Sequence, residues 1–142
     1  MLSGLRIKLH GMFELWLGEA GRGSFQQLDR LRVGLGVAYK KDVDDARESP
    51  ALSIIDLLQK KGAVILYHDP YIPSLPRFRK YHFELKSSTL TEQLLHRIDA
   101  AVIVTDHSSI DYQWVVKHAP LVIDTLNVTK NMKQWRKKIV KA

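Results

Sequence analysis

The chain has 142 residues, of which 22 are basic, 15 are acidic and none is cysteine, and its formal net charge is +7. This length accommodates one domain, or one domain with an appendage, and the lack of cysteine excludes disulfides, thiolate metal sites and a thiol nucleophile. The positive charge suits a polyanionic ligand, and it would also suit nucleic acid or an acidic membrane surface.

The N-terminal segment, residues 1–30, has no regular pattern, and its glycine-rich stretch at residues 18–24 is typical of a linker. We assign it no function and expect residues 31–142 to form the folded domain. No apolar run approaches the roughly 20 residues that cross a bilayer. A basic and then apolar patch near the N-terminus is a poor match to a secretory signal, because Glu14 interrupts it. We therefore expect a cytoplasmic protein.

Four apolar runs predict buried β-strands, at residues 31–38, 63–67, 100–104 and 121–123. The first helix has the clearest signals, since Ser49 is a suitable N-cap, Pro50 suits the first helical position and Gly62 is a plausible stop.

Three further helices are expected from capping residues and apolar spacing. One runs through Leu95 and is capped by Thr89 or Thr91, and the next covers residues 112–117 and is capped by Ser108 or Ser109. The last covers residues 129–139, where one stripe carries three apolar side chains, Met132, Trp135 and Ile139.

Strands that alternate with helices indicate parallel βαβ units. The expected fold is α/β, a Rossmann-like doubly wound parallel sheet with helices on both faces. In such sheets a ligand binds beyond the carboxyl ends of the strands. The segments that follow the strands should therefore line one edge: residues 39–47, 69–71, 105–107 and 124–127.

Residues 39–47 follow the first strand and lead into the capped helix, so free amide groups and the helix dipole would favour an anion there. Lys40 and Lys41 are placed to bind phosphate oxygens. Alternatively, both lysines pair with aspartates of the same loop, and the two alternatives stay open: Asp42, Asp44 and Asp45.

Arg47 is placed to bridge to an anion or to Glu48, and a buried structural salt bridge is a competing interpretation. Gly34 and Gly36 form only half of a dinucleotide-binding fingerprint, because the third glycine is missing and the helix begins too late. We favour the simpler interpretation that small residues let the strand pack closely.

Asp106, His107 and Ser108 are consecutive, but neighbouring side chains point in different directions and cannot form a catalytic relay. Helix capping by the serine is the favoured interpretation. The six histidines show no metal-ligand spacing, so we expect no metal site. The basic residues near the C-terminus are interpreted as an exposed face of a globular domain rather than a surface for nucleic acid or membrane.

Several separated motifs resemble one family. The segments 36–45 (GVAYKKDVDD) and 47–51 (RESPA), followed in order by 67–71 (YHDPY), 105–107 (TDH), 111–112 (DY) and 122–125 (VIDT), are similar to the C-terminal UDP-binding domain of the UDP-glucose/GDP-mannose dehydrogenases. The resemblance covers about residues 31–142. The basic loop from Pro76 through His82 to the SSTLT stretch is most similar to the UDP-N-acetylglucosamine 6-dehydrogenase branch.

The resemblance implies a function in two-step, NAD-dependent oxidation of a nucleotide-sugar C6 alcohol to a carboxylate. In this family an N-terminal domain holds NAD, a central helical domain dimerises, and the C-terminal domain grips the UDP part of the substrate. By motif, Tyr39 and Lys40 would bind the nucleotide-sugar, and Arg47 would reach the NAD held by the N-terminal domain. No residue of this chain is expected to be catalytic.

Three departures from the family pattern matter. The NAD domain and the central domain are not represented in the sequence, nor is the catalytic cysteine of the family, so we expect a UDP-sugar-binding domain that is inactive alone. Leu126 stands where the family commonly has arginine, and residues 1–30 do not match the family's connecting segment.

There are two alternative functions. One is a stand-alone nucleotide-binding module that acts with a separate NAD-domain partner or as a homo-oligomer. The other is a basic binder of nucleic acid or membrane, and we expect neither of those ligands.

Overall fold

The computed structural model describes residues 31–142. The expectation for residues 1–30 lies outside the described residues. Within residues 31–142 the elements in chain order are five strands, three α-helices and one short 3₁₀ helix. They are β1 (Leu31–Leu35), α2 (Pro50–Lys60), β2 (Val64–His68), α3 (Glu92–Arg97), β3 (Ile98–Ile103), α4 (Tyr112–His118), β4 (Val122–Asp124), η2 (Arg136–Lys138) and β5 (Ile139–Lys141).

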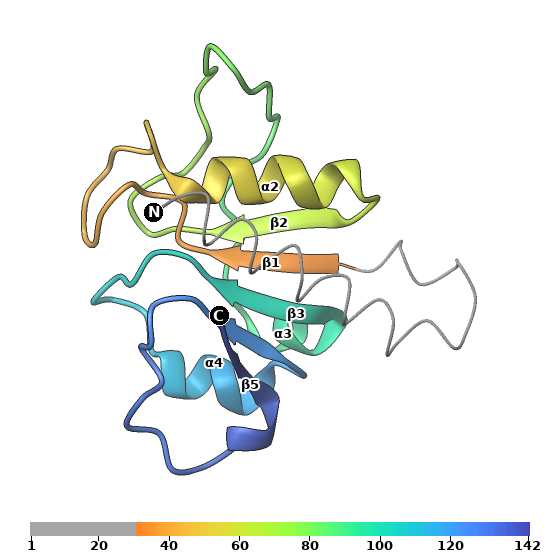
Figure 1. Cartoon of the computed structure of the whole chain (residues 1–142), viewed down its shortest axis with the longest axis vertical. Helices are drawn as coiled ribbons and strands as arrows, with labels where there is room; N and C mark the ends of the chain where they lie inside the picture. The colour runs from red at the N-terminus through yellow and green to blue at the C-terminus, as the bar shows by residue number, and fades with distance from the viewer. Residues whose placement is uncertain (1–30) are drawn as a thin grey trace.

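The strands form one five-stranded sheet in the order β2-β1-β3-β4-β5. Every neighbouring pair is parallel, with registers such as Val33 opposite Leu66 and Ala101. The carboxyl ends of the strands consequently meet at one edge, which lies on the left in Figure 1. The predicted α/β parallel sheet is confirmed.

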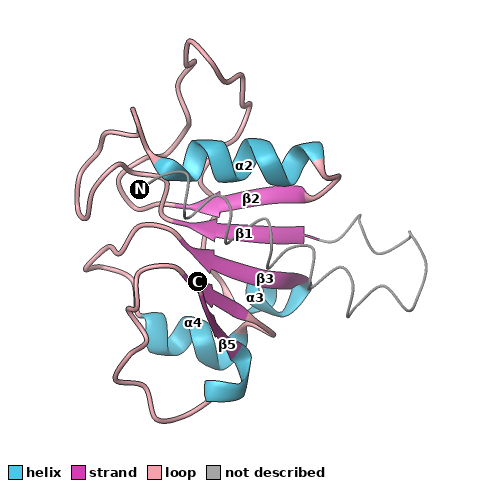
Figure 2. Ribbon diagram, in the orientation of Figure 1, coloured by secondary structure: helices cyan, strands magenta, loops and turns pink. Residues whose placement is uncertain are grey.

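Helices cover both faces of the sheet, as expected (Figure 2). Side chains of β1 point alternately to the two faces. Val33 and Leu35 pack into an apolar core together with α3 and α4. The opposite core lies under α2 and includes Ile54, Ile55 and the buried ring of Tyr67. Coverage on both sides explains why the inner strands read as continuous apolar runs.

The first helix, α2, begins and ends as predicted. The Ser49 hydroxyl accepts from the Ala51 N–H, and Pro50 occupies the first turn. Gly62 follows the helix with φ of +88°, a left-handed conformation that favours glycine. The Thr91 hydroxyl caps α3 by accepting from the Leu94 N–H. Of the two predicted caps, Thr91 and not Thr89 is therefore the N-cap.

The predicted cap of α4 is wrong. Asp111, and neither Ser108 nor Ser109, caps this helix by accepting from the Trp114 N–H. Ser108 instead donates through both its N–H and its hydroxyl to the carboxylate of Asp42. Ser108 therefore bonds to Asp42, a residue distant in the sequence, and does not cap the helix that follows it.

The first strand is shorter than the predicted range 31–38, because β1 ends at Leu35. Gly36 turns the chain with φ of +80°, and a Cβ there would lie 2.6 Å from the Thr105 carbonyl oxygen. Close packing thus explains Gly36 but not Gly34, where an added Cβ would meet nothing within 4 Å. Gly34 instead borders a small apolar void of about 10 Å³ beneath α2.

The helix predicted at residues 129–139 is also wrong. This segment holds only η2, and Ile139 begins β5, which pairs with β4 and covers its edge. Trp135 adopts a left-handed conformation with φ of 58°, which interrupts any helix. Met132, Trp135 and Ile139 do pack against the core beside α3 and α4, so the apolar stripe reflects burial without helical backbone. Among residues 31–142, no helix is long and apolar enough to span a membrane.

Candidate functional site

The loop after β1, residues 36–48, is anchored by a carboxylate from the neighbouring strand. Asp69 follows β2 and is 2% exposed. Its Oδ2 accepts from the N–H groups of Val37 (2.8 Å) and Ala38 (3.0 Å), which lie beyond the end of β1 and make no ladder hydrogen bond there. The hydroxyl of Thr105, after β3, donates to the Ala38 carbonyl (2.7 Å). Hydrogen bonds thereby join the residues that follow β1, β2 and β3.

His107 extends this anchor to the tip of the β1 loop. The imidazole is fully buried; its Nε2 lies 2.8 Å from Asp69 Oδ2, and its Nδ1 lies 2.9 Å from the backbone nitrogen of Asp42. Since Nδ1 accepts from an amide N–H, the ring proton is on Nε2 and donates to Asp69. A neutral histidine thus fixes the backbone at Asp42, which adopts a left-handed φ of 58°.

Ser108 and Tyr112 complete the network. Hydrogen bonds from the hydroxyl and N–H of Ser108 lower the pKa of Asp42 below its usual value. The Tyr112 hydroxyl donates to the Thr105 carbonyl and accepts from the His107 N–H. Burial raises the pKa of Tyr112, which keeps its hydroxyl neutral and available to donate.

The predicted binding residues lie on the exposed side of this network. The Tyr39 N–H donates to the Asp45 carbonyl (2.7 Å), which closes the loop, and the Tyr39 ring is 49% exposed. Lys40 Nζ lies 5.5 Å from the centre of that ring, a cation–π arrangement. Among the described residues, Lys40 has no carboxylate partner, whereas Lys41 pairs with Asp106 at 3.5 Å. The two lysines thus differ in their partners, since Lys41 is paired with an acid and Lys40 is not.

Arg47 pairs neither with Glu48 nor with a buried acid. Its guanidinium makes a two-point contact with the carboxylate of Asp45, at 2.9–3.2 Å, and the side chain is 80% exposed. This pair lowers the pKa of Asp45 and raises the pKa of Arg47. The predicted pairing with Glu48 and the predicted buried bridge are both wrong.

A cleft of about 400 Å³ opens beside Arg47. It is lined by the end of the β1 loop and by the segment after Asp69: Asp44, Asp45, Ala46, Arg47, Tyr71, Ile72, Pro73, Ser74 and Pro76. Tyr39 and Lys40 lie on the same sheet edge but do not line this cleft. The three predicted binding residues therefore share an edge, and only Arg47 borders the cleft.

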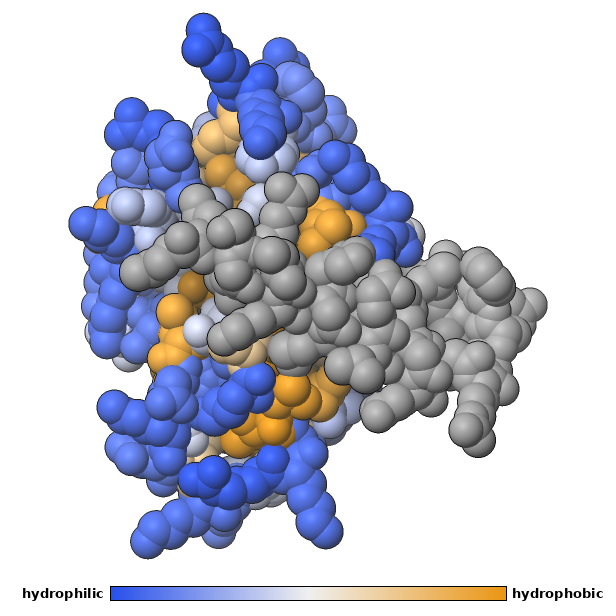
Figure 3. Space-filling model, in the orientation of Figure 1, coloured by the Kyte–Doolittle hydropathy of each residue, from blue (hydrophilic) through white to orange (hydrophobic). Residues whose placement is uncertain are grey.

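Exposed apolar side chains gather at the same edge. Tyr39, Val43, Tyr71 and Leu126 are all more than a third exposed, and each follows the carboxyl end of a strand. Figure 3 shows mainly hydrophilic residues along this side of the molecule, with smaller hydrophobic patches among them. Aromatic and apolar groups among hydrogen-bonding groups are typical of a small-molecule site.

The loop after β4 is built around Asp124, a second buried carboxylate. Its two oxygens accept from the N–H groups of Leu126, Val128 and Thr129, from the Thr129 hydroxyl and from Lys141 Nζ. Burial raises the pKa of Asp124, but these hydrogen bonds outweigh it and lower the pKa to about 2. The result is a rigid loop that presents Leu126, 48% exposed, at the edge.

Sequence reasoning missed Asp69 and His107 as the residues that shape the β1 loop. The available signal was their position, since each lies in a loop that follows a predicted parallel strand, and such loops meet at one edge of the sheet. Predicting the contact also required the strand order, because the two residues are 38 positions apart.

Comparison with known proteins gives consistent matches. Residues 34–131 match the family model described as UDP-glucose/GDP-mannose dehydrogenase family, UDP binding domain. The chain is 37% identical over 78 residues to a UDP-N-acetyl-D-mannosamine dehydrogenase of Methanococcus aeolicus, covering 54% of this chain and 16% of the relative. It is 31% identical over 110 residues to the enzyme of that name from Methanococcus vannielii, covering 72% and 23%.

Solved structures agree with these matches. An NDP-N-acetyl-D-galactosaminuronic acid dehydrogenase from Methanosarcina mazei Go1 has a TM-score of 0.65 and 31% identity, covering 94% of this chain and 28% of that chain. A UDP-D-ManNAc dehydrogenase from Pyrococcus horikoshii has a TM-score of 0.58 and 26% identity, covering 81% and 25%. The chain thus spans less than a third of the length of each of these relatives.

Proposed function

Because the chain belongs to the UDP-glucose/GDP-mannose dehydrogenase family through its UDP-binding domain, we propose that it supplies the nucleotide-sugar grip of an NAD-dependent 6-dehydrogenase. The observation that carries the proposal is the shared edge at which Tyr39, Lys40 and Arg47 stand exposed above one buried network. The sugar stays open, since the relatives include enzymes named for UDP-N-acetyl-D-mannosamine and for UDP-glucose. The narrower expectation of a UDP-N-acetylglucosamine enzyme stays a prediction.

Lys40 and Tyr39 are the proposed contacts to the UDP-sugar. Lys40 Nζ has no described carboxylate partner, so a phosphate oxygen would not have to displace one. The exposed face of Tyr39 suits stacking or hydrogen bonding to the nucleoside part. The buried bonds of Asp69 and His107 hold the backbone beneath both residues before ligand arrives, which reduces the ordering cost of binding.

Arg47 is the proposed contact to NAD held by another domain. The exposed guanidinium beside the cleft fits this role, because its forked donors match a pyrophosphate and its only described ion pair, with Asp45, is at the surface. NAD would accept the hydride from the sugar. This chain's own part is to bind and orient the nucleotide handle, and we expect the 142-residue chain to produce no NADH by itself.

Calorimetric titration with UDP and with UDP-N-acetylglucosamine tests the proposal. We expect weak binding that falls at least about tenfold in Lys40→Ala, because a charge-assisted contact contributes on the order of 1.5–3 kcal/mol. Lys60→Ala is the matched control, since it removes one exposed lysine charge at the opposite end of α2. Equal binding by wild type and Lys40→Ala would remove Lys40 from the site.

A salt series and an activity assay complete the test. Binding that falls steeply with salt and ignores UDP would identify a general polyanion surface instead. Production of NADH by the purified chain with a UDP-sugar and NAD would contradict the expected inactivity. Co-purification of an NAD-binding partner that restores turnover would favour the stand-alone module.

A further inference from the structure

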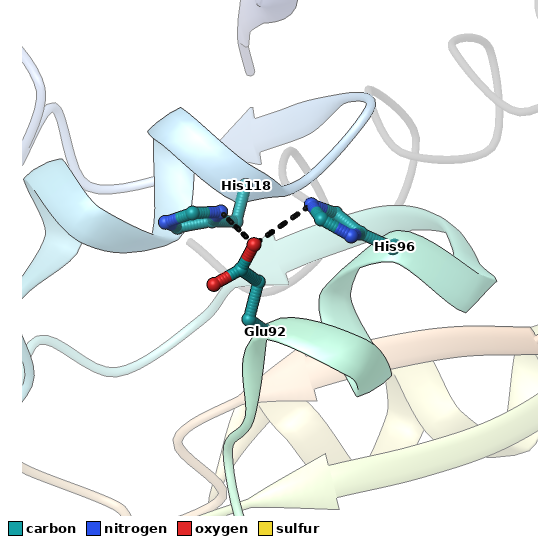
Figure 4. Close-up of side chains that lie close together, drawn as sticks. All are labelled: Glu92, His96 and His118. Atoms are coloured by element: carbon teal, nitrogen blue, oxygen red, sulfur yellow. Dashed lines mark ion pairs between the residues drawn. The ribbon is translucent and has the colours of Figure 1, made fainter.

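Three potential metal ligands converge between α3 and α4. Glu92 and His96 lie one turn apart on α3, and His118 is the last residue of α4. Glu92 Oε1 lies 3.9 Å from His96 Nε2 and 3.5 Å from His118 Nδ1. In Figure 4 the Glu92 carboxylate points between the two imidazole rings. One ligand atom from each residue falls within 4.8 Å of the others.

We propose that Glu92, His96 and His118 bind a divalent transition-metal ion such as Zn²⁺. Zinc accepts imidazole nitrogen and carboxylate oxygen at about 2.0–2.2 Å, so ligand atoms around a tetrahedral ion stand roughly 3.3 Å apart. The two distances from the Glu92 oxygen, 3.5 and 3.9 Å, are close to that value, and the two imidazole nitrogens, which lie within 4.8 Å of each other, would move closer by side-chain rotation. Three protein ligands leave one position for water.

The histidines show no metal-ligand spacing along the sequence, but the fold brings two of them together with Glu92, and this arrangement supports a metal site over a chance cluster. Residues i and i+4 of a helix share one face, which places Glu92 and His96 side by side. His118 then approaches from a different helix, so the three donors surround a point and do not form a row.

The surroundings hold His118 in position. Its side chain is 13% exposed, and its ring packs at 5.2 Å against the ring of Trp114 and at 5.6 Å against that of His96. The neighbouring Val115 and Val116 are fully buried and fix the helix. Such packing reduces the entropy lost when the ligand binds.

Lys138 lowers the affinity that we expect for a metal ion. Its ammonium donates to the carbonyl oxygens of Lys117 and Ala119, on either side of His118. This nearby positive charge opposes a bound cation. We therefore expect micromolar affinity, on the order of 10⁻⁶ M, well short of that of a closed structural zinc site.

The proposed metal site is separate from the sheet edge that carries Tyr39, Lys40 and Arg47. His118 leads into the amino end of β4, whereas Tyr39, Lys40 and Arg47 follow the carboxyl end of β1. The metal proposal and the UDP-binding proposal thus fail independently, and UDP should not change the affinity for zinc.

Titration of the 142-residue chain with ZnCl₂ at pH 7.5 tests the proposal. We expect one equivalent to bind to wild type and the affinity to fall at least about tenfold in His96→Ala, since even outer-shell losses reach that size. His96 has an exposed side chain, so this variant should fold. His82→Ala removes an exposed histidine outside the cluster and is the matched control.

Co²⁺ provides a direct reading of the ligand set. Wild type and His82→Ala should develop visible d–d absorption bands, and His96→Ala and Glu92→Gln should lose most of that intensity. Folded wild type that binds no zinc would overturn the proposal. Equal affinity in wild type and His96→Ala would do the same.

Discussion

Two buried carboxylates organise the loops at the carboxyl edge of the sheet, and they do so over different distances in the chain. Asp69 accepts from Val37, Ala38 and His107, residues contributed by the ends of other strands. Asp124 accepts mainly from its own loop, Leu126 to Thr129, with Lys141 added from β5. The first loop therefore exists only when the sheet is assembled, whereas the second is largely specified by local sequence.

Removing Asp69 should be the most damaging change at this edge. Asp69→Ala leaves the buried N–H groups of Val37 and Ala38 and the Nε2–H of His107 without an acceptor, at about 1–3 kcal/mol for each group. We expect the free energy of unfolding to fall by about 4 kcal/mol or more, measured by urea denaturation.

Asp124→Ala is the matched comparison. Its loss should be smaller, because the amides of Leu126 and Val128 and the ammonium of Lys141 are only partly buried and can turn to water, which leaves the two buried donors of Thr129 without an acceptor. If Asp124→Ala proves the more damaging of the two, the distinction between an assembled and a local loop does not hold.

Gly36→Ala should be the next most severe change, and it acts on the assembled loop. The left-handed φ of +80° and the 2.6 Å approach to the Thr105 carbonyl oxygen together predict a loss of about 3 kcal/mol by thermal or urea unfolding.

Gly34→Ala is the control for glycine content, since an added methyl group there meets nothing within 4 Å and faces an apolar void. We expect that variant to match wild type or to gain up to about 1 kcal/mol. Equal losses in both variants would show that the turn at Gly36 is not the cause.

Acid should weaken the local loop through Asp124. Hydrogen bonds lower its pKa from the ordinary 3.8 to about 2 in the folded chain, so its charged form is stabilised by folding. The contribution, about 2 kcal/mol, is fully present above the unfolded value and is lost as the pH falls from about 4 to 2. Urea unfolding at several pH values measures it.

Asp124→Asn supplies the reference for this titration. It removes the ionisable group, so its stability should depend less on pH over the same interval. Parallel pH profiles for the variant and wild type would assign the acid sensitivity to other carboxylates.

Leu126→Arg should produce the smallest effect, a gain in UDP affinity of a few-fold, about 1 kcal/mol. The rigid loop around Asp124 presents residue 126 at the edge, so an arginine would stand there without disturbing the core. Calorimetry measures the gain, and Leu126→Met controls for side-chain length. No gain would indicate that the UDP phosphates do not approach this loop.

The sequence predicted the parts of the fold that depend on neighbouring residues. Ser49, Pro50 and Gly62 bound α2 as expected, and four apolar runs became four of the strands. β5 was missed because it is only three residues long, Ile139–Lys141, and none of them is fully buried, so a helical stripe of Met132, Trp135 and Ile139 gave the stronger signal. Edge pairing with β4 outweighed that local preference.

The candidate site was predictable in its location and not in its contacts. Parallel strands place their following loops at one edge, which put the loop that carries Tyr39, Lys40 and Arg47 beside the segments that follow β2 and β3. The partner of Arg47 is Asp45, two residues away, although Glu48 is adjacent. Glu48 adopts a left-handed φ of 62°, and no sequence pattern indicated that conformation.

The amide hydrogens of Val37 and Ala38 offer a native reporter of the proposed nucleotide loop. Both are buried against one oxygen of Asp69 rather than in a strand ladder. Their deuterium exchange should consequently be as slow as that of β1 itself, although they belong to a connecting segment. The exchange of these two amides, measured by NMR, would report whether this loop is folded in the absence of ligand.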